Sequence, residues 1–184
     1  LTISFSPIEK SFGFSIVNEN IDGSNPTVII QNIQSILSPS YSPQGDKILY
    51  AGIQSNKTTV AIIDALSGKK LNESELDGIV LDTAWVGSSL YISLAPKGNA
   101  TSNNASIVTL SEELVLFSTQ LPNTDGAEIN IVPISNVLIS FLRATNKNGV
   151  LSKETEGTVV LYDTLSKEYS DFDKAQKIIG YIHE

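Results

Sequence analysis

The side chains that most often carry enzyme chemistry are scarce in this chain. His183, next to the last residue, is the only histidine, and there is no cysteine. Nucleophilic catalysis by Ser-His-Asp or Cys-His needs a histidine held beside the nucleophile, and His183 is expected to be a solvated tail residue. The lack of cysteine also excludes disulfides and zinc-thiolate sites. We therefore expect no catalytic residue of these classes.

Carboxylates offer a second route to chemistry. Three acidic pairs are close in sequence: Asp171 and Asp173, Glu112 and Glu113, and Glu154 and Glu156. A glycosidase needs two carboxylates facing each other across a cleft, whereas these pairs lie in turn-like sequence and are expected to be solvated. The stretch NENIDGSNPTVI, residues 18–29, matches a calcium loop at its first positions but has Ile29 where the bidentate glutamate belongs. The sequence predicts no enzyme, no metal site and no cofactor.

Composition limits the partners. The 184 residues carry a net charge of −8, and Arg143 is the only arginine. Nucleic-acid binding needs clustered Lys and Arg, so we expect no nucleic-acid partner. No apolar run approaches the roughly 20 residues of a membrane helix, so no transmembrane segment is expected.

Four Asn-X-Ser/Thr sequons make N-linked glycans a candidate modification. They are Asn56, Asn72, Asn99 and Asn104. The chain also lacks methionine, even at position 1, which favours a processed form. Together with low charge and abundant Ser, Thr and Asn, these features predict an extracellular or cell-surface glycoprotein.

The elements that would position any site are short strands. Helical periodicity is nearly absent, and apolar runs such as residues 47–53, 59–64, 90–94 and 158–162 are separated by clusters of Gly, Pro, Asn and Asp. Many short strands with turn signals between them predict an all-β sandwich, barrel or propeller.

A repeat narrows this choice. A large residue, a turn and an apolar strand recur in "FSPIEKSFGFSIV", "YSPQGDKILYAGI", "WVGSSLYISL" and "VPISNVLISFL". Each is followed by a polar loop and another strand, and "IIDALSGK" matches "LYDTLSKE" with Asp64 aligned to Asp163. Tyr41 and Trp85 are the predicted core anchors between repeats. The predicted repeats cover about residues 1–37, 38–80, 81–126 and 127–175 of one all-β domain.

These passages resemble the blade of a TolB-type or WD-repeat-like β-propeller. The "SP-x-G-x-x-I-x-Y" pattern resembles the hairpin to the second strand, and "x-I-x-D-x-x-S-G-x" resembles the hairpin from third to fourth. The resemblance implies antiparallel blades that bury their faces by stacking on one another. A β-sandwich with convergent hairpins is the alternative fold.

Both ends of the sequence are strand-like. In residues 1–6, Leu1, Ile3 and Phe5 alternate with polar residues, and residues 176–184 are mostly apolar. In a closed propeller the two terminal strands complete one shared blade. In a self-assembling surface protein, an N-terminal strand can instead insert into a neighbouring subunit's sheet. The candidate assembly residues are Leu1, Ile3, Phe5, Ile178, Ile179 and Ile182.

Two functional hypotheses follow. The first is a non-enzymatic structural or adhesive surface protein, possibly a filament subunit, whose partners are other copies of itself or another surface protein. The second is a propeller-type binding module or fragment that holds a peptide, glycan or protein on loops such as residues 96–104 and 145–157.

Overall fold

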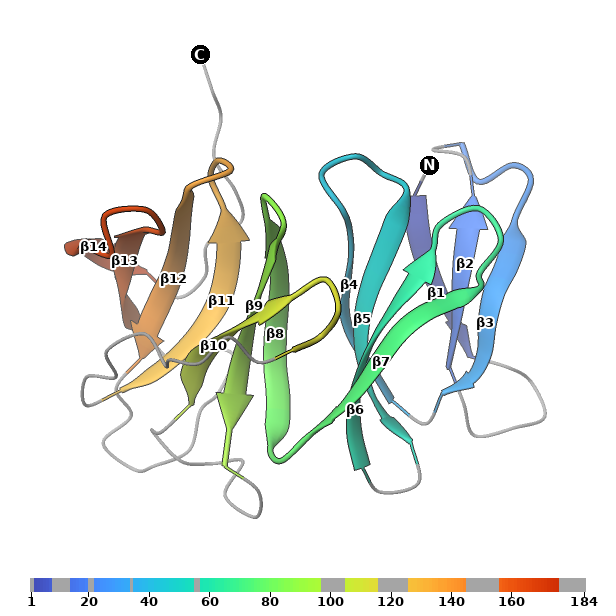
Figure 1. Ribbon diagram of the computed structural model, residues 1–184, viewed down its shortest axis with the longest axis horizontal. Coiled ribbons are helices and arrows are strands. Elements are labelled where there is room, and N and C mark those ends of the chain that lie inside the picture. The colour runs from blue at the N-terminus through green and yellow to red at the C-terminus, as the bar shows by residue number, and fades with distance from the viewer. Residues whose placement is uncertain are drawn as a thin grey trace. The chain divides into compact units, whose positions relative to one another are not determined.

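The chain folds entirely as β-structure in the part that the structure describes (Figure 1). The computed structural model describes residues 2–7, 14–19, 22–33, 35–54, 57–96, 105–115, 126–144 and 156–175. Within these ranges there is no helix, and hence none long and apolar enough to cross a membrane. The chain divides into two compact units, Leu1–Leu76 (unit 1) and Asp77–Glu184 (unit 2). The predicted all-β class is confirmed.

Unit 1 contains two antiparallel sheets. The first has the order β1 (Thr2–Pro7), β2 (Phe14–Glu19) and β3 (Thr27–Ile33). The second has the order β4 (Ser35–Tyr41), β5 (Lys47–Gln54), β6 (Lys57–Asp64) and β7 (Lys70–Leu76). Each strand pairs with the next one in sequence, so every connection within a sheet is a hairpin.

The second sheet explains why these sequences form strands. β6 is rich in β-branched residues, and its Val60, Ile62 and Ile63 are buried on both faces of the sheet. The outer strand β7 instead alternates exposed and half-buried residues and carries Lys, Asn, Ser and Glu. A polar outer strand with a bulge at Leu71, as β7 has, discourages edge-to-edge association.

The two sheets of unit 1 share one core. Its buried residues come from β2, β5, β6 and the residue after β6: Ile16, Ile48, Tyr50, Ala61, Ile63 and Ala65. Ile29 and Ile30 of β3 pack against this cluster. Two hydrogen bonds also join the sheets, from Asn18 Nδ2 to the Ala65 carbonyl at 3.3 Å and from the Tyr41 hydroxyl to Asn18 Oδ1 at 3.3 Å.

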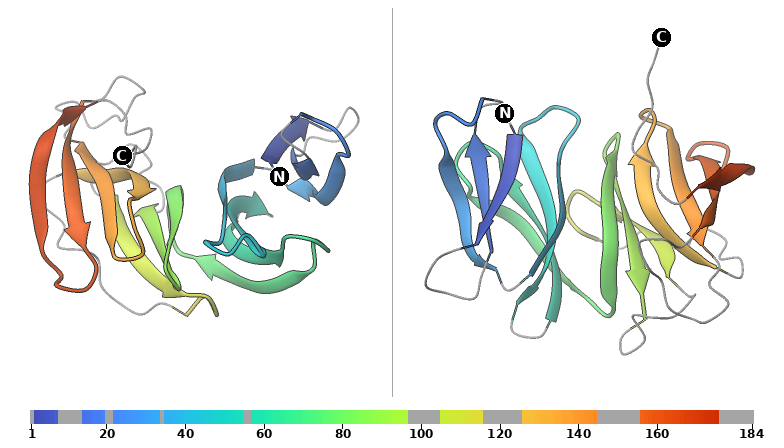
Figure 2. Two further views of the ribbon diagram at one scale, coloured as in Figure 1. Left: turned by 90° about the horizontal axis from the view of Figure 1, so that it is seen from above. Right: turned by 180° about the vertical axis from the view of Figure 1, so that it is seen from behind.

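Unit 2 also contains two antiparallel sheets, each twisted (Figure 2). The third sheet has the order β8 (Ile79–Val86), β9 (Ser89–Ala95) and β10 (Ser106–Ser111). The fourth has the order β11 (Ala127–Pro133), β12 (Leu138–Ala144), β13 (Gly157–Asp163) and β14 (Tyr169–Ala175). β11 contacts all three strands of the third sheet, so it is the strand through which the two sheets meet.

The core of unit 2 lies at this meeting of sheets. Its buried residues are Ala84, Val86, Tyr91, Ile107, Ile131, Ile139, Phe141, Val160 and Tyr162. They come from all three strands of the third sheet and from β11, β12 and β13. The third and fourth sheets therefore bury residues against each other, as blades must when they cannot form a core alone.

The N-terminal strand is already paired within the chain. β1 forms a continuous antiparallel register with β2 from Thr2↔Glu19 to Pro7↔Phe14. The strand predicted at residues 176–184 lies outside the described residues.

Candidate interaction surface

The turn between β6 and β7, residues 64–69, is held by one aspartate and is called here the Leu66 turn. Asp64 Oδ1 accepts hydrogen bonds from the Leu66 N–H at 3.2 Å, the Ser67 N–H at 2.7 Å and the Ser67 hydroxyl at 2.6 Å. The backbone closes the turn from Gly68 N–H to the Asp64 carbonyl at 3.0 Å. The Ser67 hydroxyl and N–H hold the pKa of Asp64 below its usual value, so the carboxylate stays ionised.

The turn between β13 and β14, residues 163–168, has the same construction and is called the Leu165 turn. Asp163 Oδ1 accepts from the Leu165 N–H at 2.8 Å and the Ser166 N–H at 2.9 Å. The Lys167 N–H donates to the Asp163 carbonyl at 3.0 Å. Bonds from the Ser166 and Leu165 N–H groups lower the pKa of Asp163. The aligned Asp64 and Asp163 thus accept equivalent hydrogen bonds from the backbone of their turns, in two different sheets.

Each turn is also fixed to the neighbouring turn of its own sheet. The Ala65 N–H donates to the Asp46 carbonyl at 2.9 Å, and the Thr164 N–H donates to the Val137 carbonyl at 2.8 Å. Gly68 packs so closely on β3 that an added Cβ would lie 2.7 Å from the Ile29 carbonyl oxygen. These hydrogen bonds therefore hold both turns in an ordered conformation.

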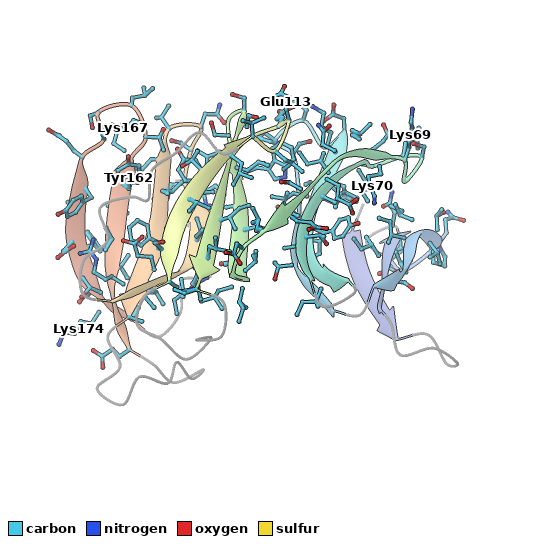
Figure 3. The ribbon with its side chains drawn as sticks, turned by 60° about the horizontal axis from the view of Figure 1, so that its bottom comes forward. Lys69, Lys70, Glu113, Tyr162, Lys167 and Lys174 are labelled. Atoms are coloured by element: carbon cyan, nitrogen blue, oxygen red, sulfur yellow. The ribbon has the colours of Figure 1, made fainter. Side chains whose placement is uncertain are left out.

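Each of the two turns exposes a leucine. Leu66 is 89% exposed and Leu165 is 75% exposed, at equivalent positions of the two turns. Lys69 lies at the end of the Leu66 turn, and Lys167 lies in the Leu165 turn, as Figure 3 labels them. Each turn thus exposes a large apolar side chain to water, with a lysine in the same turn. Such a side chain is suited to contact another molecule.

The predicted glycosylation sites fall mostly outside the described residues. Asn56, Asn99 and Asn104 are among the residues that the structure does not describe, as is most of the predicted binding loops 96–104 and 145–157. Asn72 lies on β7 and is half-buried. N-glycosylation therefore stays a prediction.

The predicted assembly residues are spread in the same way. Ile3 and Phe5 lie in β1, whose backbone pairs with β2. The other four lie outside the described residues: Leu1, Ile178, Ile179 and Ile182. Of the predicted anchors, Tyr41 packs against the core of unit 1, and Trp85 is 3% exposed in unit 2.

Glu128 of β11 is a buried carboxylate that sequence reasoning missed. Its side chain is fully buried between the third and fourth sheets. Its Oε2 accepts from the Ile107 N–H at 3.1 Å, and no hydrogen bond reaches its Oε1. Burial raises the pKa of Glu128 to about 7, although the Ile107 N–H and the Arg143 charge oppose that rise.

The backbone of Glu128 completes a junction between the sheets. Its N–H donates to the Ala105 carbonyl at 2.9 Å, and its carbonyl accepts from the Ser93 hydroxyl. Nearby, Asp82 Oδ2 of β8 accepts from the Ile131 N–H at 2.8 Å. We call this set, centred on Glu128, the Glu128 junction.

A carboxylate of raised pKa can serve as a general acid, but here burial keeps substrate away from Glu128. Among the described residues, no group of three His, Cys, Asp or Glu side chains could hold a metal ion. The strand sequence "GAEINIVP" gives no warning of this burial, because alternation alone would turn Glu128 towards water. The one available signal was Arg143, the only arginine, which lies opposite Glu128 on β12.

Comparison with known proteins supports the resemblance to TolB-type propellers. No protein-family model matches the chain. Over 69 residues it is 29% identical to the Tol-Pal system protein TolB of Xanthomonas campestris pv. campestris (strain B100). That match covers 38% of this chain and 16% of the relative, so the matched segment corresponds to a small part of that protein.

Solved structures match nearly the whole chain. The β-propeller domain of the Trilobed protease from Pyrococcus furiosus matches with a TM-score of 0.65 and 14% identity, over 92% of this chain and 52% of that one. A putative TolB from Agrobacterium tumefaciens matches with a TM-score of 0.65 and 14% identity, over 89% of this chain and 61% of that one. The predicted resemblance is confirmed: the sheets of this chain are blades of the β-propeller kind, as in TolB-like proteins.

Proposed function

We propose that this chain is a propeller-type binding module, not an enzyme, in which the Leu66 turn of unit 1 and the Leu165 turn of unit 2 are each a contact site for a protein partner. The observation that carries the proposal is the pair of exposed leucines at equivalent places on two turns of the same construction. A flexible loop would lose conformational entropy on binding, whereas turns that are already ordered bind with little further loss.

The chemistry of the turns indicates the kind of partner. Burying one exposed leucine contributes roughly 1.5–3 kcal/mol, so each turn supplies one apolar anchor for its own contact. Lys69 and Lys167 accompany the leucines in a chain of net charge −8. A partner surface with apolar pockets bordered by carboxylates fits these two features best, with the charges setting orientation more than affinity.

The same proposal includes a lack of enzymatic activity and an extracytoplasmic location. One of the structures with this fold is a domain of a protease, so the fold by itself is compatible with a role beside an enzyme. Low charge, the polar composition and the sequons support an extracytoplasmic site of action.

The test is a selection followed by substitution. A phage-displayed peptide library is selected against the immobilised chain, and the affinity of a selected peptide is measured by fluorescence polarisation. We expect Leu66→Ser or Leu165→Ser to weaken binding by about 10-fold to 100-fold, the loss that corresponds to exposing one leucine.

Matched controls lie on the outer strand of each unit. Leu71 on β7 is 42% exposed and Phe172 on β14 is 77% exposed, and both lie outside the two turns. Leu71→Ser and Phe172→Ser should leave the affinity unchanged. Peptides that bind the Leu66→Ser/Leu165→Ser chain as well as the unaltered chain would exclude the turns as the binding surface.

The hypothesis of a filament or adhesive subunit has less support. A strand that is donated to a neighbour must be free of its own sheet, and β1 pairs with β2 along its whole length. Neither the TolB match nor the propeller folds favour self-assembly. Light scattering on the purified chain addresses it directly, since large polymers would restore that hypothesis.

A further inference from the structure

Glu128 lies where the third and fourth sheets of unit 2 are joined. Its side chain is fully buried, and three hydrogen bonds from this one residue reach Ile107, Ala105 and Ser93 of or beside the third sheet. Yet its Oε1 has no hydrogen-bond partner. An unpaired buried carboxylate oxygen is costly when the group is ionised and much less costly when it is protonated.

Arg143 is the charged side chain directly opposite. It pairs with Glu128 in the register of β11 and β12, yet its guanidinium reaches the other way. Its Nη1 donates to Asp171 of β14 at 3.1 Å, and its guanidinium carbon lies 5.3 Å from the centre of the Tyr169 ring. Its buried Nε has no hydrogen-bond partner. The charges therefore run in the order Glu128, Arg143, Asp171 across the fourth sheet.

The other elements around Glu128 carry few ionisable groups. Asp82 of β8 holds the Ile131 N–H and the Thr83 N–H. Within their described residues, β9, β10 and β13 bring no ionisable group other than Tyr91, Tyr162 and Asp163 at the end of β13. Arg143 is thus the cation opposite Glu128, and Asp171 competes with Glu128 for the Arg143 guanidinium.

We propose that Glu128 and Arg143 form a proton-controlled latch that tightens or loosens the junction between the third and fourth sheets. With Glu128 protonated, the junction is closed and Arg143 binds Asp171 and Tyr169. When Glu128 loses its proton, the buried charge attracts the Arg143 guanidinium, whose Nε–H is unpaired, and draws its Nη1 away from Asp171. The closed junction then becomes less stable, because keeping an ionised carboxylate buried costs free energy. The pKa of about 7 sets the range in which this happens.

The sequence provides an unusually clean probe. Because Arg143 is the only arginine, a uniformly 15N-labelled chain has a single guanidinium Nε–H resonance. We expect that resonance to shift between about pH 5 and pH 8 with a midpoint near the pKa of Glu128. In parallel, the opening constant from hydrogen exchange of the Ile107 amide should rise about 10-fold between pH 6 and pH 8, after correction for intrinsic exchange.

Two backgrounds isolate Glu128. Histidine is the side chain that ordinarily changes charge between pH 5 and 8, so all spectra are recorded with His183→Gln, which removes the only histidine. In Glu128→Gln the Arg143 resonance and the Ile107 opening constant should no longer depend on pH across this range. Glu156→Gln removes an exposed carboxylate of the same unit and serves as the control. In this variant the Arg143 resonance and the Ile107 opening constant should depend on pH as they do in the parent chain.

A pH-dependent shift of the Arg143 Nε–H resonance that persists unchanged in Glu128→Gln would overturn the latch, as would an Ile107 amide whose opening does not depend on pH. If Glu128→Gln does not fold, the carboxyl 13C resonance of Glu128 in the parent chain replaces it. That resonance must then share its midpoint with the Arg143 shift, and two different midpoints would refute the coupling.

Discussion

Gly68→Ala should destabilise unit 1 far more than Gly45→Ala, although both glycines have a positive φ. Gly68 lies at φ 69° and Gly45 at φ 76°. An added Cβ at Gly68 would lie 2.7 Å from both the Ile29 Cγ2 and the Ile29 carbonyl oxygen, whereas at Gly45 nothing lies within 4 Å. The backbone strain is common to both, so the difference measures how tightly β3 packs on the Leu66 turn.

The magnitude follows from these two terms. A non-glycine residue at this φ costs about 1 kcal/mol, and overpacking against a backbone oxygen adds roughly 1–3 kcal/mol. We therefore expect Gly45→Ala to cost about 1 kcal/mol and Gly68→Ala about 2–4 kcal/mol. Lys167 holds the equivalent position of the Leu165 turn at φ 63°, so the turn itself accepts a side chain.

Scanning calorimetry is the appropriate assay, because the only tryptophan, Trp85, lies in unit 2 and would not report on unit 1. At about 3 °C per kcal/mol for a chain of this size, Tm should fall by about 3 °C in Gly45→Ala and by roughly 6–12 °C in Gly68→Ala. Equal losses in the two variants would show that Ile29 does not pack on the turn, and would refute the sheet packing described for unit 1.

Three further predictions concern the core, the Glu128 junction and the exposed leucine. Phe141 is 1% exposed in the core of unit 2, so Phe141→Ala should cost about 3–5 kcal/mol in urea unfolding followed by Trp85 fluorescence, and a loss below 1 kcal/mol would contradict that packing. Folding raises the pKa of Glu128 from 4.5 to about 7, so its protonated form stabilises unit 2 at acidic pH and this contribution is lost as the pH rises through 7. Glu128→Gln should remove a fall of up to about 3 kcal/mol between pH 4.5 and pH 8, and unchanged pH dependence of unfolding would count against the burial of that carboxylate. Leu66→Ser should change Tm by less than about 2 °C because the side chain is 89% exposed, and a larger loss in calorimetry would mean that Leu66 contributes to the stability of the fold.

Hairpins with strong turn chemistry could be predicted from the sequence. Ser42 and Pro43 begin the turn that joins β4 to β5, and the Ser42 hydroxyl donates to Asp46 at 2.8 Å. Asp64 and Asp163 end their strands at the aligned positions. These signals are local, because the residues that fix the turn lie within it.

Burial between sheets could not be predicted in the same way. Glu128 is a polar residue in an alternating strand, and alternation assigns it to a solvent-facing side. Asn18 shares the strand face of Ile16, but alternation does not show which residues of the next sheet it binds. In the structure, Asn18 binds Ala65 and Tyr41 of the next sheet, and Glu128 binds the third sheet. Which face a second sheet covers depends on contacts between residues far apart in the chain, and a single sequence does not encode them locally.

The exposure of Leu66 and Leu165 could not be predicted from the sequence either. The alignment of "IIDALSGK" with "LYDTLSKE" marks the two turns as equivalent, but an apolar residue in a short run is normally expected to be buried. Only the hydrogen bonds from Leu66 and Ser67 to Asp64, which turn the side chain outward, distinguish a presented leucine from a core residue.

The central claim is that the leucine turn of each unit is a contact site for a partner, and amide chemical-shift mapping tests it most directly. A 15N-labelled chain is titrated with a peptide selected against it, and the perturbed amides are assigned. The account predicts that the largest shifts fall in residues 64–69 and 163–168, with small shifts on β7 and β14 beyond the turns. Shifts concentrated instead on β1 or on residues 97–104 and 145–155, with both turns unaffected, would contradict it.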